Sequence, residues 1–365
     1  LFGASPPAFL REACMDVIDR ETLERREHEL LSPWACHSDE SSGRTREEEP
    51  DPLRTCFQCD RDRILHSKSF RRLANKTQVF LAPEGDHYRT RLTHTIEVAQ
   101  IACAIALPLG LNVDLTEAIA LGHDLGHTPF GHCGERALQR AMARRLHCGP
   151  DDPRLFHHNE QSARIVCLLE KDGRGLNLTR EVIDGIVNHN QGTAAHTLEG
   201  QVVARADRMA YVTHDMDDAK RAGILSEESL PVDLRNILGS SSSERIETMV
   251  HDAVSASAQC GKIAMSDVVW DAMMGMRRFL SENLYTRGEA KREEPKAAHL
   301  VEELFTHFVR HPDEIPAEYR SRRQDSVDVQ AADYVSSMTD RYAIRLYEEL
   351  NVPKAWSLSD QRGDS

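Results

Sequence analysis

The stretch LGHDLGHTPFGHCGE, from Leu121 to Glu135, places three histidines and two carboxylates within fifteen positions, at the end of an apolar run. Ionisable side chains are rarely placed against an apolar core without a partner. His123 and Asp124 are adjacent, so both can reach one point beside the end of a helix. An imidazole nitrogen with carboxylate oxygens suits a divalent ion such as Mn, Fe or Mg. A capped helix end with a local hydrogen bond explains the pair alone equally well.

Two other segments carry groups of the same kind. His94 lies in RLTHTIEVAQ and Asp207 in VVARADRMAYVTHDMDDA, each among apolar residues spaced by three and four. Taken singly, each fits a hydrogen-bonded core residue. Three helices that offer His, His-Asp and Asp in that order predict one shared metal site.

Apolar residues recur at intervals of three and four along most of the chain, and period-two alternation is scarce. We therefore predict an all-α fold. Asp114 is expected to cap the helix that ends near Leu125, and 333–350 is expected to be one helix. The Ser-, Arg-, Glu- and Pro-rich stretch 36–52 is expected to be a mobile connector, and 240–245 and 287–296 are expected to be loops.

We divide the 365 residues into three parts. Residues 1–53 form an N-terminal helix and flexible linker, and 54–230 form the catalytic core. Residues 231–365 form a C-terminal helical region that completes the fold, with a polar tail from about residue 357.

Composition limits the partners and the compartment. The formal net charge of −14 repels a phosphate backbone, so nucleic acid is not an expected partner. The chain contains no apolar run of membrane-spanning length and no export signal, which predicts a cytoplasmic protein without a membrane partner.

The nine cysteines are an odd number, and the Cys56-x-x-Cys59 pair has no second pair to complete a zinc site, so we interpret them as ordinary thiols. Glycine-rich phosphate loops are absent, so side chains and a metal would have to bind any nucleotide.

Longer phrases carry a resemblance to a known family. They are RTCFQCDRDRILHSKSFRRLANKTQVF (54–80), DHYRTRLTHT (86–95), TLEGQVV (197–203) and DYVSSMTDRYA (333–343). With the His-Asp pattern, they resemble the deoxyguanosinetriphosphate triphosphohydrolase-like proteins of the HD-domain superfamily, over about Arg54 to Trp356. The resemblance implies an HD-domain helical bundle with additional C-terminal helices. It also implies hydrolysis of a deoxynucleoside triphosphate at the α-phosphorus, which gives a deoxynucleoside and inorganic tripolyphosphate.

The resemblance further assigns roles to individual residues. One divalent ion per subunit (Mn, Mg, Fe or Ni) would be held by His94, His123, Asp124 and Asp207. His132 and Glu135 match a catalytic pair, in which the histidine acts as acid or base. Positions that line the phosphates, the sugar or the base are matched by Arg91, His127, His158, Arg208, Tyr211, Asp215 and Gln78. Tyr211 and Asp215 follow Asp207 by four and eight residues, which puts all three on one helix face. Gln78 fits an exposed polar helix residue equally well.

Several alternatives stay open. His189 and His196 are interpreted as core or surface residues, and His214, in a second His-Asp pair, as structural. The family usually has Arg where this chain has Cys59. Another HD phosphohydrolase, acting on a nucleoside monophosphate or an alarmone, would share the metal ligands, and so would a catalytically weak nucleotide sensor. The resemblance also implies a homo-oligomer (tetramer or hexamer) and, in some members, a nucleotide activator. The preferred base is left open.

Overall fold

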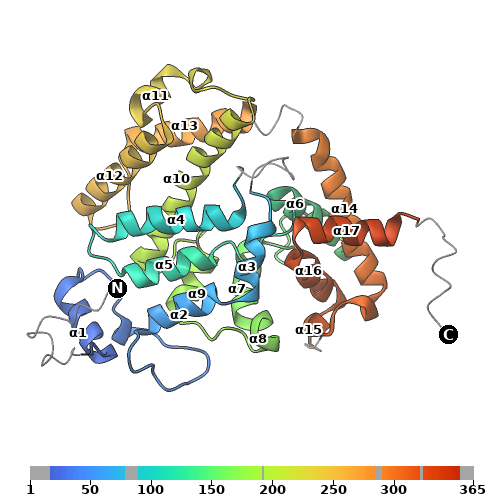
Figure 1. The fold of residues 1–365 in the computed structure, drawn as a ribbon, viewed down its shortest axis with the longest axis horizontal. Helices are drawn as coiled ribbons and strands as arrows, with labels where there is room; N and C mark the ends of the chain where they lie inside the picture. The colour runs from blue at the N-terminus through green and yellow to red at the C-terminus, as the bar shows by residue number, and fades with distance from the viewer. Residues whose placement is uncertain (1–16, 79–88, 191–192, 284–289, 321–323, 354–365) are drawn as a thin grey trace, which may run out of the picture.

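The computed structural model describes residues 17–78, 89–190, 193–283, 290–320 and 324–353. Within these ranges every regular element is a helix, and the only extended pairings are two isolated bridges, Arg44 with Thr179 and Thr77 with Thr90. The all-α prediction is confirmed (Figure 1). None of the described helices is long and apolar enough to cross a lipid bilayer.

A first hydrophobic core surrounds the helices that will carry the site. Its central helices are α4 (Arg91–Ala106), α5 (Val113–Gly122) and α10 (Leu198–Arg221), with α2 (Cys56–Leu65) and α9 (Arg180–Val187) packed on α5. Gly122 lets α5 and α9 approach closely just before His123, because a Cβ there would lie 2.5 Å from Ile186 Cδ1. The apolar spacing of these helices therefore places their polar positions at a tightly packed junction.

Further helices extend this core. The same cluster includes residues of α11 (Val232–Leu238), α12 (Ser242–Cys260) and α13 (Asp267–Asn283) (Figure 1). α12 and α13 pack against α10, and α11 packs against α12 and α13. The shorter elements are α1 (Arg20–Leu30), α3 (Lys68–Arg72), α7 (His158–Arg164) and α8 (Glu170–Gly173).

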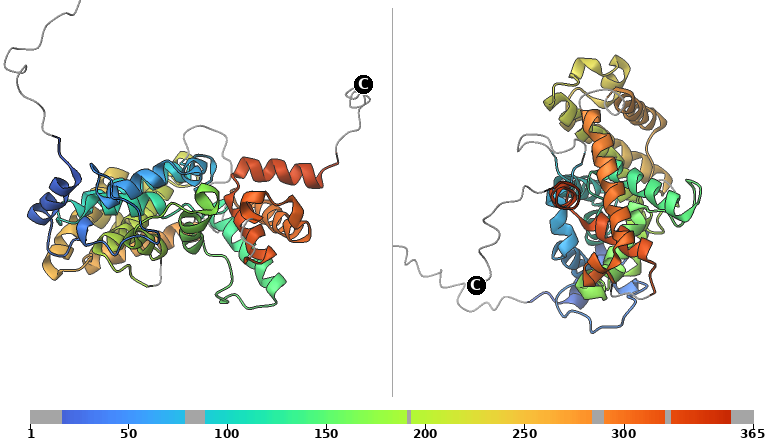
Figure 2. Two further views of the ribbon diagram at one scale, coloured as in Figure 1. Left: turned by 90° about the horizontal axis from the view of Figure 1, so that it is seen from below. Right: turned by 90° about the vertical axis from the view of Figure 1, so that its right-hand side faces the viewer.

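A second core lies at the other end of the molecule (Figures 1 and 2). There α6 (Gly131–Leu146) packs against α14 (Ala290–Arg310), and α15 (Ala317–Arg320), α16 (Val327–Ser337) and α17 (Asp340–Asn351) complete the cluster. The LGHDLGHTPFGHCGE stretch runs from the end of α5 into the first turns of α6, so it connects the two cores. The domain boundaries at residues 53 and 230 stay a prediction.

The stretch 36–52 is not the mobile connector that we expected. Its backbone is mostly irregular, but its side chains and amides bind the body of the protein. Arg44 pairs with the buried Asp60, and Ser41 Oγ donates to Glu181 at 2.8 Å. These partners lie far away in the sequence, so the polar composition of the stretch did not indicate them.

Three other expectations about helices are corrected. Residues 333–350 form two helices because Thr339 caps α17, its side chain accepting from Tyr342 N at 3.3 Å. Ser241 likewise caps α12, so most of 240–245 is helical, and α14 already includes 290–296. Asn112, rather than Asp114, caps α5. Residues 287–289 and the tail from 357 lie outside the described residues.

Candidate functional site

The structure brings together the four predicted metal ligands from three helices. His94 lies in the first turn of α4, whose start is set by a capping box between Thr90 and Thr93. His123 and Asp124 follow the end of α5, and Asp207 lies in the middle of α10. The α4, α5 and α10 helices pack against one another, so their separate polar positions meet at one point.

The ligand atoms are spaced as they would be around one cation. His94 Nε2 lies 3.1 Å from Asp207 Oδ1 and 3.9 Å from Asp124 Oδ2. His123 Nε2 lies 3.6 Å from Asp124 Oδ1 and 3.7 Å from Asp207 Oδ1. Ligands at about 2.0–2.2 Å from a common ion are roughly 3 to 4 Å from one another. The donor set of two nitrogens and two carboxylates therefore fits a divalent ion.

The His123 ring is oriented for such a role. Its Nδ1 donates to Ala120 O at 2.7 Å, which turns the Nε2 lone pair toward the site. Nε2 is buried and has no hydrogen-bond partner among the described residues. A buried polar atom of this kind is costly unless something binds it.

The electrostatics of the site favour a cation. Burial by itself lowers the pKa of His123, but Asp124 and Asp207 outweigh burial and raise it to about 9. Burial raises the pKa of both carboxyl groups, yet the histidines, and Arg91 in the case of Asp124, hold each pKa well below its usual range. Both carboxylates thus stay ionised and supply negative charge to the site.

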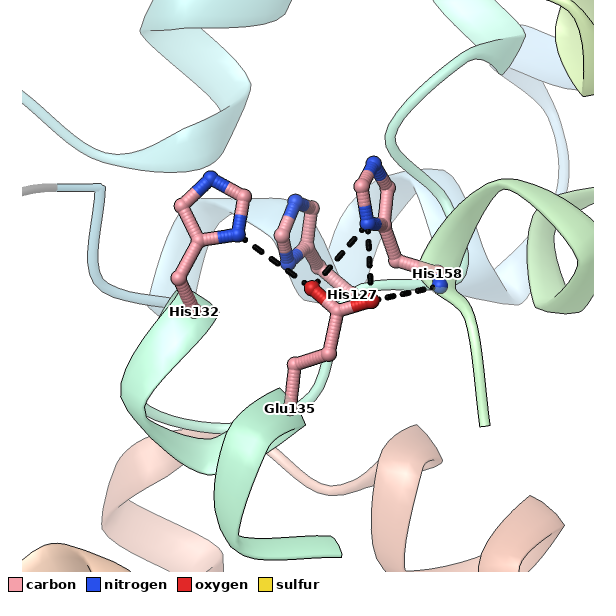
Figure 3. Close-up of side chains that lie close together, drawn as sticks. All are labelled: His127, His132, Glu135 and His158. Carbon is pink, nitrogen blue, oxygen red and sulfur yellow. Dashed lines mark hydrogen bonds and ion pairs between the residues drawn. The ribbon is translucent and has the colours of Figure 1, made fainter. Parts of the chain in front are cut away.

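A second histidine cluster lies beside the first one, at the start of α6. Glu135 accepts from His132 Nδ1 at 3.2 Å, from His158 Nδ1 at 3.0 Å and from His158 N at 2.9 Å. Figure 3 shows His132 and His158 reaching Glu135 from either side, with the His127 ring between them. Burial alone would raise the pKa of Glu135, but the hydrogen bonds from His132 and His158 hold it well below its usual range. Glu135 is therefore an ionised carboxylate that orients two imidazole rings.

This second cluster is not arranged as a metal site, although its ligand atoms lie within 4.8 Å of one another. The rings of His127 and His158 are stacked, with centroids 4.1 Å apart and planes at 14°. An imidazole lone pair lies in the plane of its ring, so the lone pairs of two stacked rings point side by side and do not meet at one ion. The cluster is suited instead to holding and moving protons.

Arg91 supplies a buried positive charge between the two clusters. Its side chain is 2 % exposed, and Nη1 donates to Asp124 Oδ2 at 2.6 Å. Nε and Nη2 have no hydrogen-bond partner among the described residues. Gly131 permits the close approach, because a Cβ there would lie 2.9 Å from Arg91 Nη2. Unpaired buried guanidinium donors indicate a position for an anion.

The remaining predicted residues lie at or near the same cavity. Gln78, Arg208 and Tyr211 line it, together with His94, Asp124, His127, His132, His158 and Asp207. Asp215 is fully buried, one turn beyond Tyr211, and burial raises its pKa well above the usual range. Burial therefore disfavours the charged form of this carboxyl group.

Three lining residues were missed in the sequence: His189, Asn190 and Arg277. His189 is buried, its Nε2 lies 3.3 Å from His158 Nε2, and its ring meets that of His123 edge to face. Arg277 comes from α13, about seventy positions after Asp207, without a motif around it. A basic residue on an amphipathic helix is most often a solvent-facing one, so only the tertiary packing shows where Arg277 lies.

Other features do not contribute ligands to the candidate metal site. His214 is buried with Nδ1 3.1 Å from Glu97 Oε2, and His196 is exposed and pairs with Asp184.

A larger groove, lined by Cys56 and Cys59, runs between α1, residues 38–54 and α2. Its charges neutralise one another, as in the pairs Arg54–Asp51, Arg63–Glu48 and Arg20–Glu24. The smaller cavity, with its unpaired buried donors, is therefore the better candidate for chemistry.

Comparison with known proteins agrees with this choice. The HD domain model matches residues 91–212, which contain all four candidate ligands, and the phosphohydrolase-associated domain model matches 263–349. The deoxyguanosinetriphosphate triphosphohydrolase-like protein of Caldanaerobacter subterraneus is 52% identical over 338 residues, which cover 92% of this chain and 97% of the relative. This chain belongs to the deoxyguanosinetriphosphate triphosphohydrolase-like family. It is an HD-type phosphohydrolase with an all-α fold.

Other members of the deoxyguanosinetriphosphate triphosphohydrolase-like family match over similar lengths. The Clostridium perfringens protein is 46% identical over 345 residues, covering 92% of this chain and 98% of the relative. A Deinococcus radiodurans member is 41% identical over 377 residues, covering 91% and 99%. A solved structure of a hypothetical protein from Aquifex aeolicus aligns with 80% of this chain and 70% of its own at 19% identity and a TM-score of 0.41, which is too distant to add to the assignment.

Proposed function

We propose that the protein hydrolyses deoxynucleoside triphosphates at the α-phosphorus and releases a deoxynucleoside and inorganic tripolyphosphate. The observation that carries the proposal is the buried Arg91 guanidinium, whose unpaired Nε and Nη2 lie beside four converging ligand atoms. Such a site suits a phosphate bound next to a cation. The nucleotide class follows from the names of the relatives, which specify deoxyguanosine triphosphate.

His94, His123, Asp124 and Asp207 would hold one divalent ion. When bound, this ion supplies Lewis-acid polarisation of a phosphate oxygen and offsets part of the triphosphate charge. Mn, Mg, Fe and Ni are all compatible with two imidazole and two carboxylate ligands, and availability in the cell selects among them.

The side chains of the protein would bind and orient the triphosphate. Arg91 would donate to a phosphate oxygen through its unpaired nitrogens, and His127, whose Nδ1 is buried without a partner among the described residues, would donate to another. Arg208 and Arg277 would add positive charge at the rim of the cavity. Both the charge and the rigid placement of these donors matter, because in-line attack requires a neutralised and fixed phosphate.

His132 and Glu135 would perform the proton transfer. As water bonds to the α-phosphorus, the bond to the 5′ oxygen breaks, so the water loses a proton and the 5′ oxygen gains one. Glu135 binds His132 Nδ1, which leaves Nε2 to carry one of these two protons. His132 is half exposed and faces the cavity, as a group that meets substrate must.

Tyr211 and Asp215 would bind the deoxyribose 3′-hydroxyl, and Gln78 would contact the sugar or the base. Asp215 is fully buried, and its carboxyl group lies within hydrogen-bonding reach of Tyr211. A carboxyl group beside a tyrosine offers oxygen atoms that can accept a hydrogen bond from a sugar hydroxyl group.

We also propose that the protein acts in the cytoplasm as a homo-oligomer, a tetramer or a hexamer. The cysteines within the described residues are all free thiols, which suits a reducing compartment. Light scattering of the metal-loaded protein, with and without deoxynucleotides, would measure the oligomeric state and reveal any nucleotide-dependent assembly.

The deciding experiment is product analysis. The Mn²⁺-loaded full chain is incubated with each of the four deoxynucleoside triphosphates, alone and with the other three, and the products are separated by chromatography. We expect equal amounts of deoxynucleoside and tripolyphosphate, and the rates will give the base preference. Orthophosphate or pyrophosphate released from a deoxynucleoside triphosphate would show that another bond is cleaved and would contradict the proposal. No product from any of the four, with phosphate release from a nucleoside monophosphate or an alarmone supplied in their place, would point to another HD phosphohydrolase. Tight binding without turnover would point to a nucleotide sensor.

A further inference from the structure

The turn between α16 and α17 contacts the loop that precedes α6. Lys76, which is 2 % exposed, donates through Nζ to His127 O and, at 2.8 Å, to Ser336 O at the end of α16. One buried ammonium group thus joins the loop of the candidate site to the C-terminal helices. Metal binding, phosphate binding and proton transfer by the cavity residues do not by themselves require a buried lysine at this position.

Asp340 forms a second link at the same place. It is the first residue of α17, and its Oδ1 accepts from Phe130 N at 3.0 Å. Its Oδ2 accepts from Thr77 N at 2.9 Å and from Thr77 Oγ1. A single buried carboxylate therefore binds the loop before α6 and the segment that leads to Gln78. The break between α16 and α17 is what places this carboxylate at a helix start, where negative charge is favoured.

The loop needs such support. Phe130 has φ 62° and Gly131 has φ 55°, so two successive residues adopt the left-handed conformation immediately before His132. For a bulky side chain such as Phe this conformation is unfavourable and persists only when the surroundings impose it. Arg91 touches the loop from the other side, at Gly131.

We propose that Asp340 and Lys76 are positioning residues, which hold the loop 127–131 in the conformation that places His132 and Glu135 against the substrate. This inference rests on the proposed hydrolysis and adds to it a task for the C-terminal helices. They complete the second core, and through the α16–α17 turn they also set the geometry of the acid–base pair.

Replacing Asp340 tests the idea with a matched control. Asp340→Asn turns one acceptor into a donor that faces a backbone N–H, so the loop is released on one side. Asp60→Asn makes the same substitution at a residue that does not line the cavity: Asp60 is also buried, accepts from Thr179 N and Thr179 Oγ1, both at 2.7 Å, and in addition pairs with Arg44. In metal-loaded protein we expect Asp340→Asn to lower kcat by roughly 30- to 100-fold with KM changed by less than about threefold. Asp60→Asn should lower the melting temperature comparably and leave kcat within about twofold.

Equal kcat values for the two variants, at comparable losses of melting temperature, would overturn the proposal, because Asp340 would then have only a structural role. If Asp340→Asn does not fold, Thr77→Val provides the same test in a milder form, as it removes one hydroxyl donor and keeps the backbone bond. Its kcat should fall by about threefold or more, and an unchanged kcat would contradict the proposal.

Hydrogen exchange separates this inference from the proposed function. In whichever of Asp340→Asn and Thr77→Val folds, the amides of 127–131 should exchange at least about tenfold faster than in the wild type, and those of α5 should be unchanged. Unchanged exchange of these loop amides would refute the positioning role of Asp340 and Lys76, whatever substrate the enzyme hydrolyses. If the wild-type protein releases no tripolyphosphate, the proposed function is refuted. The exchange measurement still tests whether Asp340 and Lys76 hold the loop.

Discussion

The two histidine clusters of the cavity contain the same kinds of residue and differ in geometry. In the first cluster the rings of His94 and His123 are tilted by 56°, and their Nε2 atoms both approach Asp207. In the second cluster the His127 and His158 rings are stacked at 14°, and Glu135 takes hydrogen bonds from His132 and His158. Ring orientation, more than residue type, thus separates a site suited to a cation from one suited to proton transfer.

The largest expected effect is the loss of a ligand from the first cluster. Asp207→Ala should lower kcat/KM by at least about 10³-fold, because the cation and the negative charge that attracts it are lost together. Steady-state product release is the measurement. The control is Asp184→Ala, which removes a carboxylate that also pairs with a histidine, His196, outside the cavity. If both variants lost the same activity, the first cluster would have no special role.

A change in the second cluster should lower activity by less than this and should leave metal binding intact. His132→Gln should lower kcat by about 10²- to 10³-fold, within the usual contribution of a general acid or base. Its control is His196→Gln, since His196 Nδ1 also binds a carboxylate, Asp184, at 2.9 Å. A variant that lost its metal together with its activity would show that the two clusters are not separate in function.

Arg91 lies between the clusters, and a replacement that keeps its charge should have a smaller effect than either of the two changes above. Arg91→Lys keeps the charge but loses the planar set of donors, so we expect kcat/KM to fall by roughly 10- to 100-fold. Arg245→Lys serves as the control, because Arg245 is also fully buried but pairs with Glu227 away from the cavity. Activity of Arg91→Lys equal to that of the wild type would argue against phosphate binding by the unpaired nitrogens.

The last prediction concerns stability around the second cluster and not activity. Burial, with Arg72 and Arg91 nearby, lowers the pKa of Lys76 to about 7. The unfolded chain therefore binds more protons than the folded chain between pH 7 and about 10.5, and the free energy of unfolding should rise with pH in this window. Relative to Lys76→Met, the wild type should gain on the order of 3 kcal/mol between pH 7 and 10, measured by urea unfolding. Parallel pH profiles would contradict the lowered pKa.

Much of this architecture could be predicted because it depends on local patterns. Apolar periodicity determines which face of α4, α5 and α10 is buried, so the polar residues on those faces, among them His94 and Asp207, were expected to meet. The two-helix form of 333–350 was missed because both halves continue one apolar pattern, and only the cap at Thr339 separates them.

Features that depend on partners far away in the sequence could not be predicted. Arg44 finds Asp60 and Ser41 finds Glu181 only after folding, so their segment was taken for a mobile connector. His189 and Arg277 reach the cavity through the packing of α9 and α13, and no spacing in the sequence indicates this. The stacking that distinguishes the second cluster from the first is likewise a tertiary feature, since His127 and His158 come from different segments.

Locating the bound metal tests the central claim most directly. Crystals of the Mn²⁺-loaded wild-type protein, studied by anomalous diffraction together with elemental analysis of the same preparation, would give the position and number of ions. We predict one ion per chain, within coordination distance of His94, His123, Asp124 and Asp207. An ion held instead by Glu135 with His132 or His158, or the lack of any ion in the first cluster, would contradict the account.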